Sequence, residues 1–152
     1  MAVIASVAMD LARDKAENKA KMTTFIEEAA EKDVDLILFP ELALGGLPEK
    51  PRFVFVPQDV FYQLETAVLV PVGDSVHYFA ELAVRHDIYI AWGMTEQSHE
   101  SWDMIYNTLV LVGPEGYVGK YRKVHLPLTE RIMMYPGEGD YPVFDTRIGK
   151  VG

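Results

Sequence analysis

The chain begins with a strand, a helix and a second strand in succession, and this order constrains the fold more than any other feature of the sequence. Residues 3–9 form a nearly continuous apolar run with β-branched side chains, typical of a strand covered on both faces. Residues 14–32 then carry apolar side chains at helical spacing, with Asp14 and Glu17 placed as in a capping box. A second buried-strand pattern follows at 34–39. Two strands joined through a helix lie parallel, with a right-handed crossover as the rule, so the sequence predicts an α/β fold.

The middle of the chain adds a long excursion, a second helix and a third strand. Residues 41–73 contain several prolines and glycines, and we expect a long loop there with a short helix near 62–68. Long loops often shape a ligand site. A stripe of apolar side chains predicts a helix over 74–86 that Asp74 caps. Residues 88–92 predict a further strand.

The last third of the chain predicts antiparallel pairing. Residues 107–120 read as a hairpin with a glycine-bounded turn, so the sheet is expected to be mixed. Residues 141–146 resemble another strand, and we expect its returning strand to begin at Val151, which leaves a hairpin interrupted after Gly152. The sequence shows no repeat and no linker, so residues 1–152 are expected to form one domain.

The composition excludes several classes of protein. The chain has 23 acidic and 14 basic residues and a formal net charge of −9, which disfavours binding to the phosphates of nucleic acids. It has no cysteine, which excludes a disulfide framework, a thiolate metal site and a cysteine nucleophile within these residues. No apolar run reaches the roughly 18 residues of a membrane span, and residues 1–9 lack the basic start of a signal peptide. We therefore expect a cytoplasmic protein with no nucleic-acid or membrane partner.

Glu41 is the first candidate for chemistry. It follows a buried strand and Pro40, at the carboxyl end of that strand, where open α/β folds place their ligands. Partial burial there is expected to raise the pKa of the carboxyl group, which suits a general base. The alternative is an exposed loop glutamate or a helix cap.

A basic segment at 119–127 is the second candidate. Because neighbouring residues on a strand face opposite sides, Lys123 and Arg122 are expected to point in opposite directions. A buried lysine beside a carboxylate could stabilise a developing oxyanion, which makes Lys123 the candidate. We expect Lys120 and Arg122 to face solvent or an interface. The alternative is a solvated basic patch.

The other charged and polar residues give weaker signals. Glu130, just before a tight loop at 136–139, is by itself most often a helix start or a surface charge. No histidine has a partner at metal-ligand spacing with a third ligand nearby, so we expect no metal site. No glycine loop carries the pattern that binds nucleotide phosphates.

Three motifs in order resemble the carbon-nitrogen hydrolase (nitrilase) superfamily. They are F-P-E-L-A-L-G-G at 39–46, G-x-V-G-K-Y-R-K-V-H-L at 116–126, and P-G-x-G followed by V-F-D-T-x-x-G-K-V-G at 136–152. The resemblance covers the whole chain, with spacings typical of the family's amino-terminal half. It implies an α-β-β-α sandwich, of which this chain is the amino-terminal part, a mixed sheet with helices on one face. It also implies pairing into dimers and larger assemblies.

The resemblance implies a role for each candidate. Glu41 corresponds to the family's general base and Lys123 to the lysine that stabilises the tetrahedral intermediate. Glu130 resembles a second glutamate that positions substrate or nucleophile. We expect Glu41 and Lys123 to lie side by side at the carboxyl ends of neighbouring strands, with Glu130 nearby. The implied reaction is hydrolysis of a small-molecule amide, ureido or nitrile group through a cysteine thioester, with no cofactor or metal. We favour the amide type, because amidases and their relatives form most of the superfamily.

The chain departs from the family in lacking the cysteine. Family members carry it just after the G-K-V-G sequence, so we expect 1–152 to be a carbon-nitrogen hydrolase domain truncated before its nucleophile and inactive alone. We also expect an apolar sheet face that needs a homo-oligomer or a complementary carboxyl-terminal chain to cover it. The alternative is a non-catalytic scaffold or interaction module.

Overall fold

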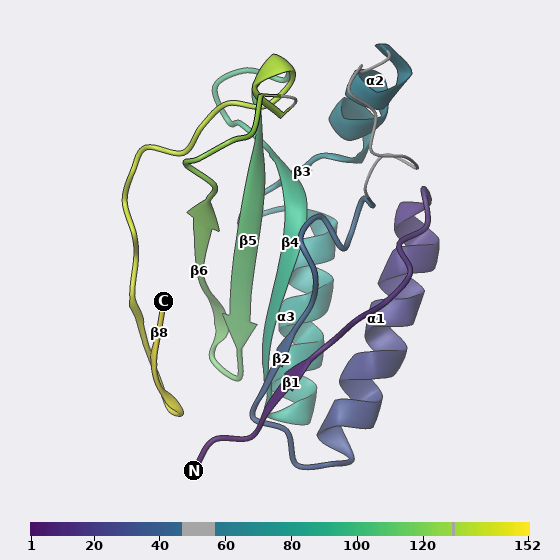
Figure 1. Ribbon diagram of the computed structural model, residues 1–152. Coiled ribbons are helices and arrows are strands. Elements are labelled where there is room, and N and C mark those ends of the chain that lie inside the picture. Colours follow the sequence, from purple (N-terminus) through teal and green to yellow (C-terminus); the bar gives the residue numbers. More distant parts are fainter. Residues whose placement is uncertain (47–56, 129) are drawn as a thin grey trace.

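The computed structural model describes residues 1–46, 57–128 and 130–152, and its centre is a twisted mixed sheet (Figure 1). The strands lie in the order β1-β2-β4-β5-β6, and β3 pairs with β4 beside this path. Their bounds are β1 (Ile4–Ser6), β2 (Leu36–Leu38), β3 (Val68–Leu69), β4 (Tyr89–Gln97), β5 (Ile105–Gly113) and β6 (Gly116–Arg122). Strands β1, β2 and β4 are parallel, whereas β4, β5 and β6 pair antiparallel. The carboxyl ends of β2, β4 and β6 therefore lie at the same end of the sheet.

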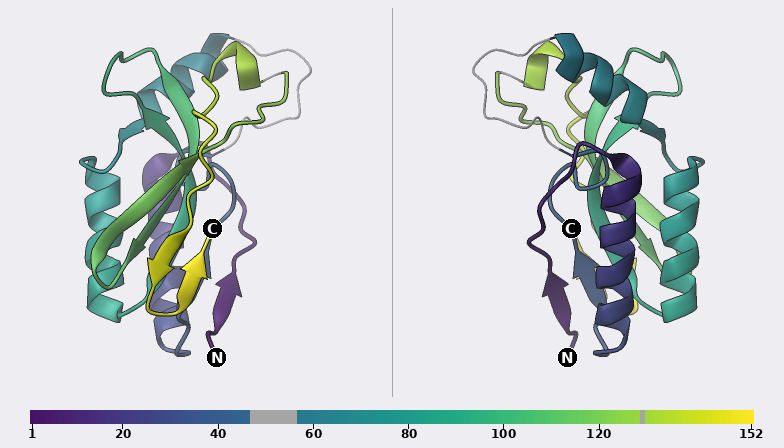
Figure 2. Two further views of the ribbon diagram at one scale, coloured as in Figure 1. Left: turned by 90° about the vertical axis from the view of Figure 1, so that its left-hand side faces the viewer. Right: turned by 90° about the vertical axis from the view of Figure 1, so that its right-hand side faces the viewer.

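Two helices cover one face of this sheet. Helices α1 (Lys15–Ala30) and α3 (Asp74–His86) lie side by side on it, and α2 (Pro57–Thr66) lies near the end of the sheet where β2, β4 and β6 finish (Figures 1 and 2). The core beneath the helices contains Trp92, whose ring centroid lies 4.9 Å from that of Phe79, and the fully buried Met22 and Ile26. Burial of each large apolar side chain contributes roughly 1.5–3 kcal/mol, so this layer supplies much of the stability.

A short hairpin covers part of the opposite face. Strands β7 (Phe144–Thr146) and β8 (Gly149–Val151) pair antiparallel, and the Phe144 ring packs where a side chain at Gly119 would otherwise stand. The expectation of a hairpin interrupted after Gly152 is therefore wrong, because the chain already turns at 147–148. The hairpin packs in one apolar cluster with Leu36 of β2, which is 8% exposed, but it leaves Ile4 of β1 62% exposed and Leu38 at the end of β2 36% exposed.

The predicted crossover, the mixed sheet and the helices on one face are confirmed. Asp14 caps α1, since its carboxylate accepts the N–H groups of Ala16 at 2.8 Å and Glu17 at 3.0 Å. The first strand is shorter than predicted and not covered on both faces, because β1 forms an edge of the sheet.

Three other predictions need correction. The cap of α3 is Gly73, and Asp74 is the first helical residue. The strand predicted at 88–92 continues to Gln97. In the excursion at 41–73, the helix spans 57–66 and is followed by β3, which local patterns did not reveal. The part of this excursion at 47–56 lies outside the described residues.

None of the helices in the described part of the chain is long and apolar enough to cross a membrane.

Candidate active site

Glu41 lies in the tight turn that follows β2. The backbone N–H of Phe39 donates to the carbonyl of Ala91 at 2.8 Å, which ties the start of this turn to β4. Gly93 permits the contact, because a Cβ atom there would lie 2.5 Å from the backbone N of Leu42 and 2.7 Å from the Cα of Glu41. A glycine on β4 thus lets two backbones approach closely where the candidate base is held.

Leu42 anchors the turn from the other side. It adopts the left-handed conformation, with φ of 52°, which is uncommon for a residue that is not glycine. Its side chain is 3% exposed and packs in an apolar cluster formed with Ile105, Leu126 and Met134. Burial of this side chain offsets the backbone strain, and the carboxylate of Glu41 is left facing outward, 49% exposed.

Lys123 and Glu130 reach the same place as Glu41. The Lys123 ammonium lies 2.6 Å from Oε1 of Glu41 and 3.0 Å from Oε1 of Glu130. Lys123 directly follows β6, and Glu130 begins a short 3-10 helix, η1 (Glu130–Ile132). The three predicted site residues are therefore brought together, although they come from three separate segments.

The placement of Glu41 and Lys123 on the sheet differs from the prediction in one respect. Glu41 and Lys123 were expected on neighbouring strands, but β4 and β5 separate β2 from β6. The side chains span the end of the sheet, and the position between them is filled from β5.

That position belongs to Asn107, which the sequence did not reveal. Its Nδ2 atom lies 2.7 Å from Oε1 of Glu41 and 3.4 Å from Oε2 of Glu130. Its backbone carbonyl accepts the N–H of Lys123 at 2.8 Å, while the Lys123 carbonyl accepts the N–H of Gly137 at 3.0 Å. The one signal that could have found Asn107 is an uncharged amide in a strand whose other side chains are mostly apolar, since a buried amide needs partners.

The electrostatics of the site favour the charged forms of Glu41 and Lys123. Burial raises the pKa of Glu41, but hydrogen bonds from Lys123 and Asn107 outweigh burial and lower the pKa below its ordinary value. Burial lowers the pKa of Lys123, but hydrogen bonds to Glu41 and Glu130 outweigh it and raise that pKa. The expectation that the Glu41 pKa is raised is therefore wrong. At neutral pH the site holds a carboxylate that can accept a proton and an ammonium that can donate hydrogen bonds.

Lys120 and Arg122 have a different role from the one expected. Both point to the helix-covered face of the sheet and bind Glu96, whose carboxylate is fully buried. The guanidinium of Arg122 donates to Glu96 through Nε at 3.0 Å and Nη2 at 2.7 Å. The prediction that these two cations face solvent or an interface is wrong, because the sheet extends further than expected and places a carboxylate opposite them.

The acid-base state of this second cluster follows from burial and pairing. Burial raises the pKa of Glu96, but hydrogen bonds from Arg122, Lys120 and Thr108 outweigh it and lower the pKa. The hydrogen bond to Glu96 raises the pKa of Arg122. The cluster anchors the end of β6 on one face of the sheet, while the side chain of Lys123, the next residue, lies toward the other face.

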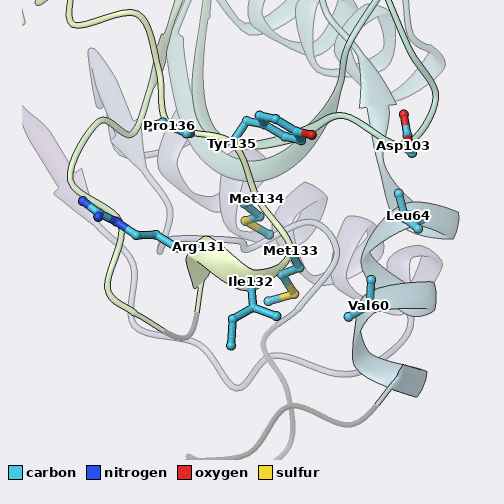
Figure 3. A pocket seen from close by; sticks show the side chains of 9 residues that line it. All are labelled: Val60, Leu64, Asp103, Arg131, Ile132, Met133, Met134, Tyr135 and Pro136. Carbon is cyan, nitrogen blue, oxygen red and sulfur yellow. The ribbon is translucent and has the colours of Figure 1, made fainter.

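A cavity of about 650 Å³ lies between α2 and the segment after Glu130 (Figure 3). Val60 and Leu64 line it from α2, and Ile132 and Met133 line it from the facing segment, so its walls are largely apolar. Glu41 and Lys123 are not among its lining residues. No three histidine, aspartate or glutamate side chains in 1–46, 57–128 and 130–152 are grouped so that they could hold a metal ion.

Comparison with known proteins identifies the family. The family model described as carbon-nitrogen hydrolase matches residues 3–152. A nitrilase from Pyrococcus abyssi is 34% identical over 136 residues, which cover 90% of this chain and 48% of that protein. Nitrilase 3 from Arabidopsis thaliana is 34% identical over 148 residues, covering 91% and 40% of the two chains. The chain thus spans about half the length of these relatives.

Solved structures of other proteins show a similar fold. Nit3 from Saccharomyces cerevisiae, a member of branch 10 of the nitrilase superfamily, has a TM-score of 0.74 at 27% identity, over 92% of this chain and 49% of that chain. An amidase from a Nesterenkonia species has a TM-score of 0.70 at 22% identity, over 92% and 49%, and shows the shared fold alone. With the family model matching nearly its whole length, the chain belongs to the carbon-nitrogen hydrolase family.

Proposed function

We propose that this chain supplies the general base and the oxyanion-binding ammonium for hydrolysis of a carbon-nitrogen bond. One observation carries the proposal: the Lys123 ammonium lies between the carboxylates of Glu41 and Glu130, at 2.6 Å and 3.0 Å, while Glu41 stays half exposed. A carboxylate that is open to solvent and kept ionised can take a proton from an approaching group.

The proposed reaction needs a cysteine, and we place it in a segment outside 1–152. Glu41 takes the thiol proton, and the thiolate adds to the carbon of an amide group. Glu41 then gives the proton to the leaving nitrogen, the carbon-nitrogen bond breaks and a thioester remains. Water attacks the thioester with its proton passing to Glu41. The carbon-sulfur bond then breaks, and the sulfur recovers the proton.

Lys123 is suited to the oxyanion of each tetrahedral intermediate. An ammonium group has three N–H donors, and the two carboxylates use two of them. The third donor can bind the oxygen on which negative charge develops, and a donor fixed in advance stabilises the transition state more than the ground state. Glu130 accepts a second hydrogen bond from the ammonium, at 3.0 Å, and is proposed as a positioning residue.

Nitrile hydrolysis is an equally supported second function. The matched relatives of Pyrococcus abyssi and Arabidopsis thaliana carry the name nitrilase, at 34% identity, whereas the amidase match rests on fold. In a nitrile the thiolate adds to the cyano carbon, and water then displaces ammonia to give the same thioester. For both substrates we propose that the apolar cavity beside α2 receives the side group of the substrate, because one wall of the cavity is formed by residues 131–136, which directly follow Glu130 in the chain.

We also propose that another chain or segment covers the sheet face left open beyond β7 and β8. The exposed side chains of Ile4, on the edge strand β1, and Leu38, on the neighbouring strand β2, lie there, and burial of apolar area contributes roughly 25 cal/mol per Å². The partner is a second copy or a complementary carboxyl-terminal chain. A cytoplasmic location stays a prediction from the sequence.

The test compares this chain with an extended chain, defined as 1–152 joined to the residues that follow it in the coding sequence. Ammonia release is measured with simple amides, N-carbamoyl amino acids and nitriles. We expect none from 1–152, and release from the extended chain that is lost when its cysteine is replaced by alanine. Turnover by 1–152 that survives repurification and disappears in Glu41→Ala overturns the proposal that the nucleophile lies outside. A stop codon directly after residue 152 supports the non-catalytic scaffold instead.

A further inference from the structure

We propose that Asn107 is a positioning residue that holds Glu41 through its Oε1 atom and so assigns proton transfer to the Oε2 atom. This inference rests on the proposed function, because it refines which atom of the general base acts. It also names Asn107 as a fourth member of the site, beside Glu41, Lys123 and Glu130.

The two oxygens of Glu41 have different surroundings. Oε1 accepts two hydrogen bonds, from Nδ2 of Asn107 at 2.7 Å and from Nζ of Lys123 at 2.6 Å. Within the described residues, Oε2 accepts no hydrogen bond. An oxygen that accepts two N–H groups, one of them charged, is the less basic of the pair, so a proton taken from a thiol or from water goes to Oε2.

Asn107 is placed to act on the whole site. It is 4% exposed and paired with Thr95 on β4, so its Cα position is set by the sheet and its side chain has little freedom. Its amide reaches both carboxylates, and its carbonyl holds the backbone of Lys123 at 2.8 Å. The carboxylates can only accept hydrogen bonds when ionised, which fixes the amide with its nitrogen toward them.

Replacement of this amide by a carboxylate of the same shape gives a sharp perturbation. Asn107→Asp removes two N–H donors and adds a third negative charge within hydrogen-bond distance of Glu41. The titratable groups that face Glu41 are then Lys123, Glu130 and the new carboxyl. Removal of a donor and addition of a like charge both raise the proton affinity of Glu41.

The first experiment follows the carboxyl carbons of the protein by ¹³C NMR as a function of pH. In Asn107→Asp we expect a roughly tenfold or greater rise in the proton affinity of Glu41. Asn107→Leu, which removes the donors without adding charge, gives a smaller rise. Thr108→Val is the matched control: it is next on the same strand and buried, but its hydroxyl donates to Glu96 on the other face at 2.8 Å. The control leaves the titration of Glu41 unchanged.

The second experiment needs no substitution and tests the assignment of the oxygens. If the proton goes to Oε2, the Asn107 amide stays hydrogen-bonded to Oε1, so its protons stay protected from exchange with solvent on the acid side of the Glu41 titration, although their chemical shifts move as the carboxylate loses its charge. Loss of that protection together with the titration overturns the assignment to Oε2. An equal effect of Asn107→Asp and Thr108→Val overturns the positioning role. If both NMR results hold and the extended chain releases no ammonia, the proposed function has failed and the inference about Asn107 has not.

Discussion

Gly93→Ala tests whether close approach of β4 holds Glu41 in place. The new Cβ would lie 2.5 Å from the backbone N of Leu42, 2.7 Å from the Cα of Glu41 and 2.8 Å from the carbonyl oxygen of Pro40, whereas ordinary contact begins at 3.4 Å. All of these atoms belong to the backbone, so no side chain can rotate away. The turn that carries Glu41 must therefore move by about 1 Å.

A shift of that size is large beside the hydrogen bonds of Glu41. They measure 2.6 Å to Lys123 and 2.7 Å to Asn107, and N–H···O bonds weaken beyond about 3.2 Å. We expect at least one to be lost, so that burial dominates and the pKa of Glu41 rises. Overpacking costs about 1–3 kcal/mol, which lowers the melting temperature of a domain of this size by roughly 2–12 °C.

The assay combines thermal unfolding with the NMR titration of Glu41. Gly45→Ala is the control from the same turn, because its Cβ would contact only the side chain of Thr66, with the hydroxyl oxygen at 3.2 Å and the Cβ atom at 3.6 Å. In the extended chain, Gly93→Ala is expected to lower kcat/KM about 100-fold, the usual effect of displacing a catalytic group by 1 Å. A Gly93→Ala protein that melts and titrates like the Gly45→Ala protein would refute the reasoning.

Three further predictions concern stability and assembly. Glu96→Gln leaves Arg122 and Lys120 without their buried counter-charge and should lower the free energy of unfolding in urea by about 3–5 kcal/mol. The control Asp145→Asn, which breaks an exposed pair with Lys150, should lower it by under about 1 kcal/mol. Equal losses of stability would contradict the stabilising role of the buried cluster. Because the pKa values of Glu41 and Glu96 are lowered from 4.5, their stabilising contribution is complete above that pH and is lost as the pH falls through the lower folded values. Glu96→Gln should therefore unfold with a shallower acid dependence than the parent protein, and an unchanged slope would contradict this. Light scattering should show that 1–152 self-associates or aggregates, and a dilution-resistant monomer with cooperative unfolding would contradict the need for a partner.

The elements that could be predicted from the sequence are those with strong local patterns. The helix that begins after Asp14 has a capping residue and a repeated apolar stripe, and both act within the helix itself. The hairpin around 113–116 is likewise marked by its own turn residues. By contrast β3 has two residues and exists only because Val68 and Leu69 lie beside the end of β4. Local patterns do not carry that information.

The site shows the same division. Glu41 and Lys123 could be chosen because each lies in a recognisable motif, and Glu130 because the family resemblance implies a second glutamate. Asn107 could not, because its importance arises from two hydrogen bonds to residues far away in the chain. Arg122 was misplaced for a related reason: the predicted strand at 88–92 stopped short of Glu96, so no buried carboxylate was expected on the sheet opposite it.

The most direct test of the central claim is the rate at which substrate acylates the cysteine of the extended chain, followed by intact mass. Glu41→Gln keeps the shape of the base and removes its ability to take a proton, so we predict acylation slower by about 10²–10⁴-fold. The control is Glu115→Gln, a half-exposed glutamate whose partner is Arg147. Acylation of Glu41→Gln at the rate of Glu115→Gln would contradict the assignment of Glu41 as the general base.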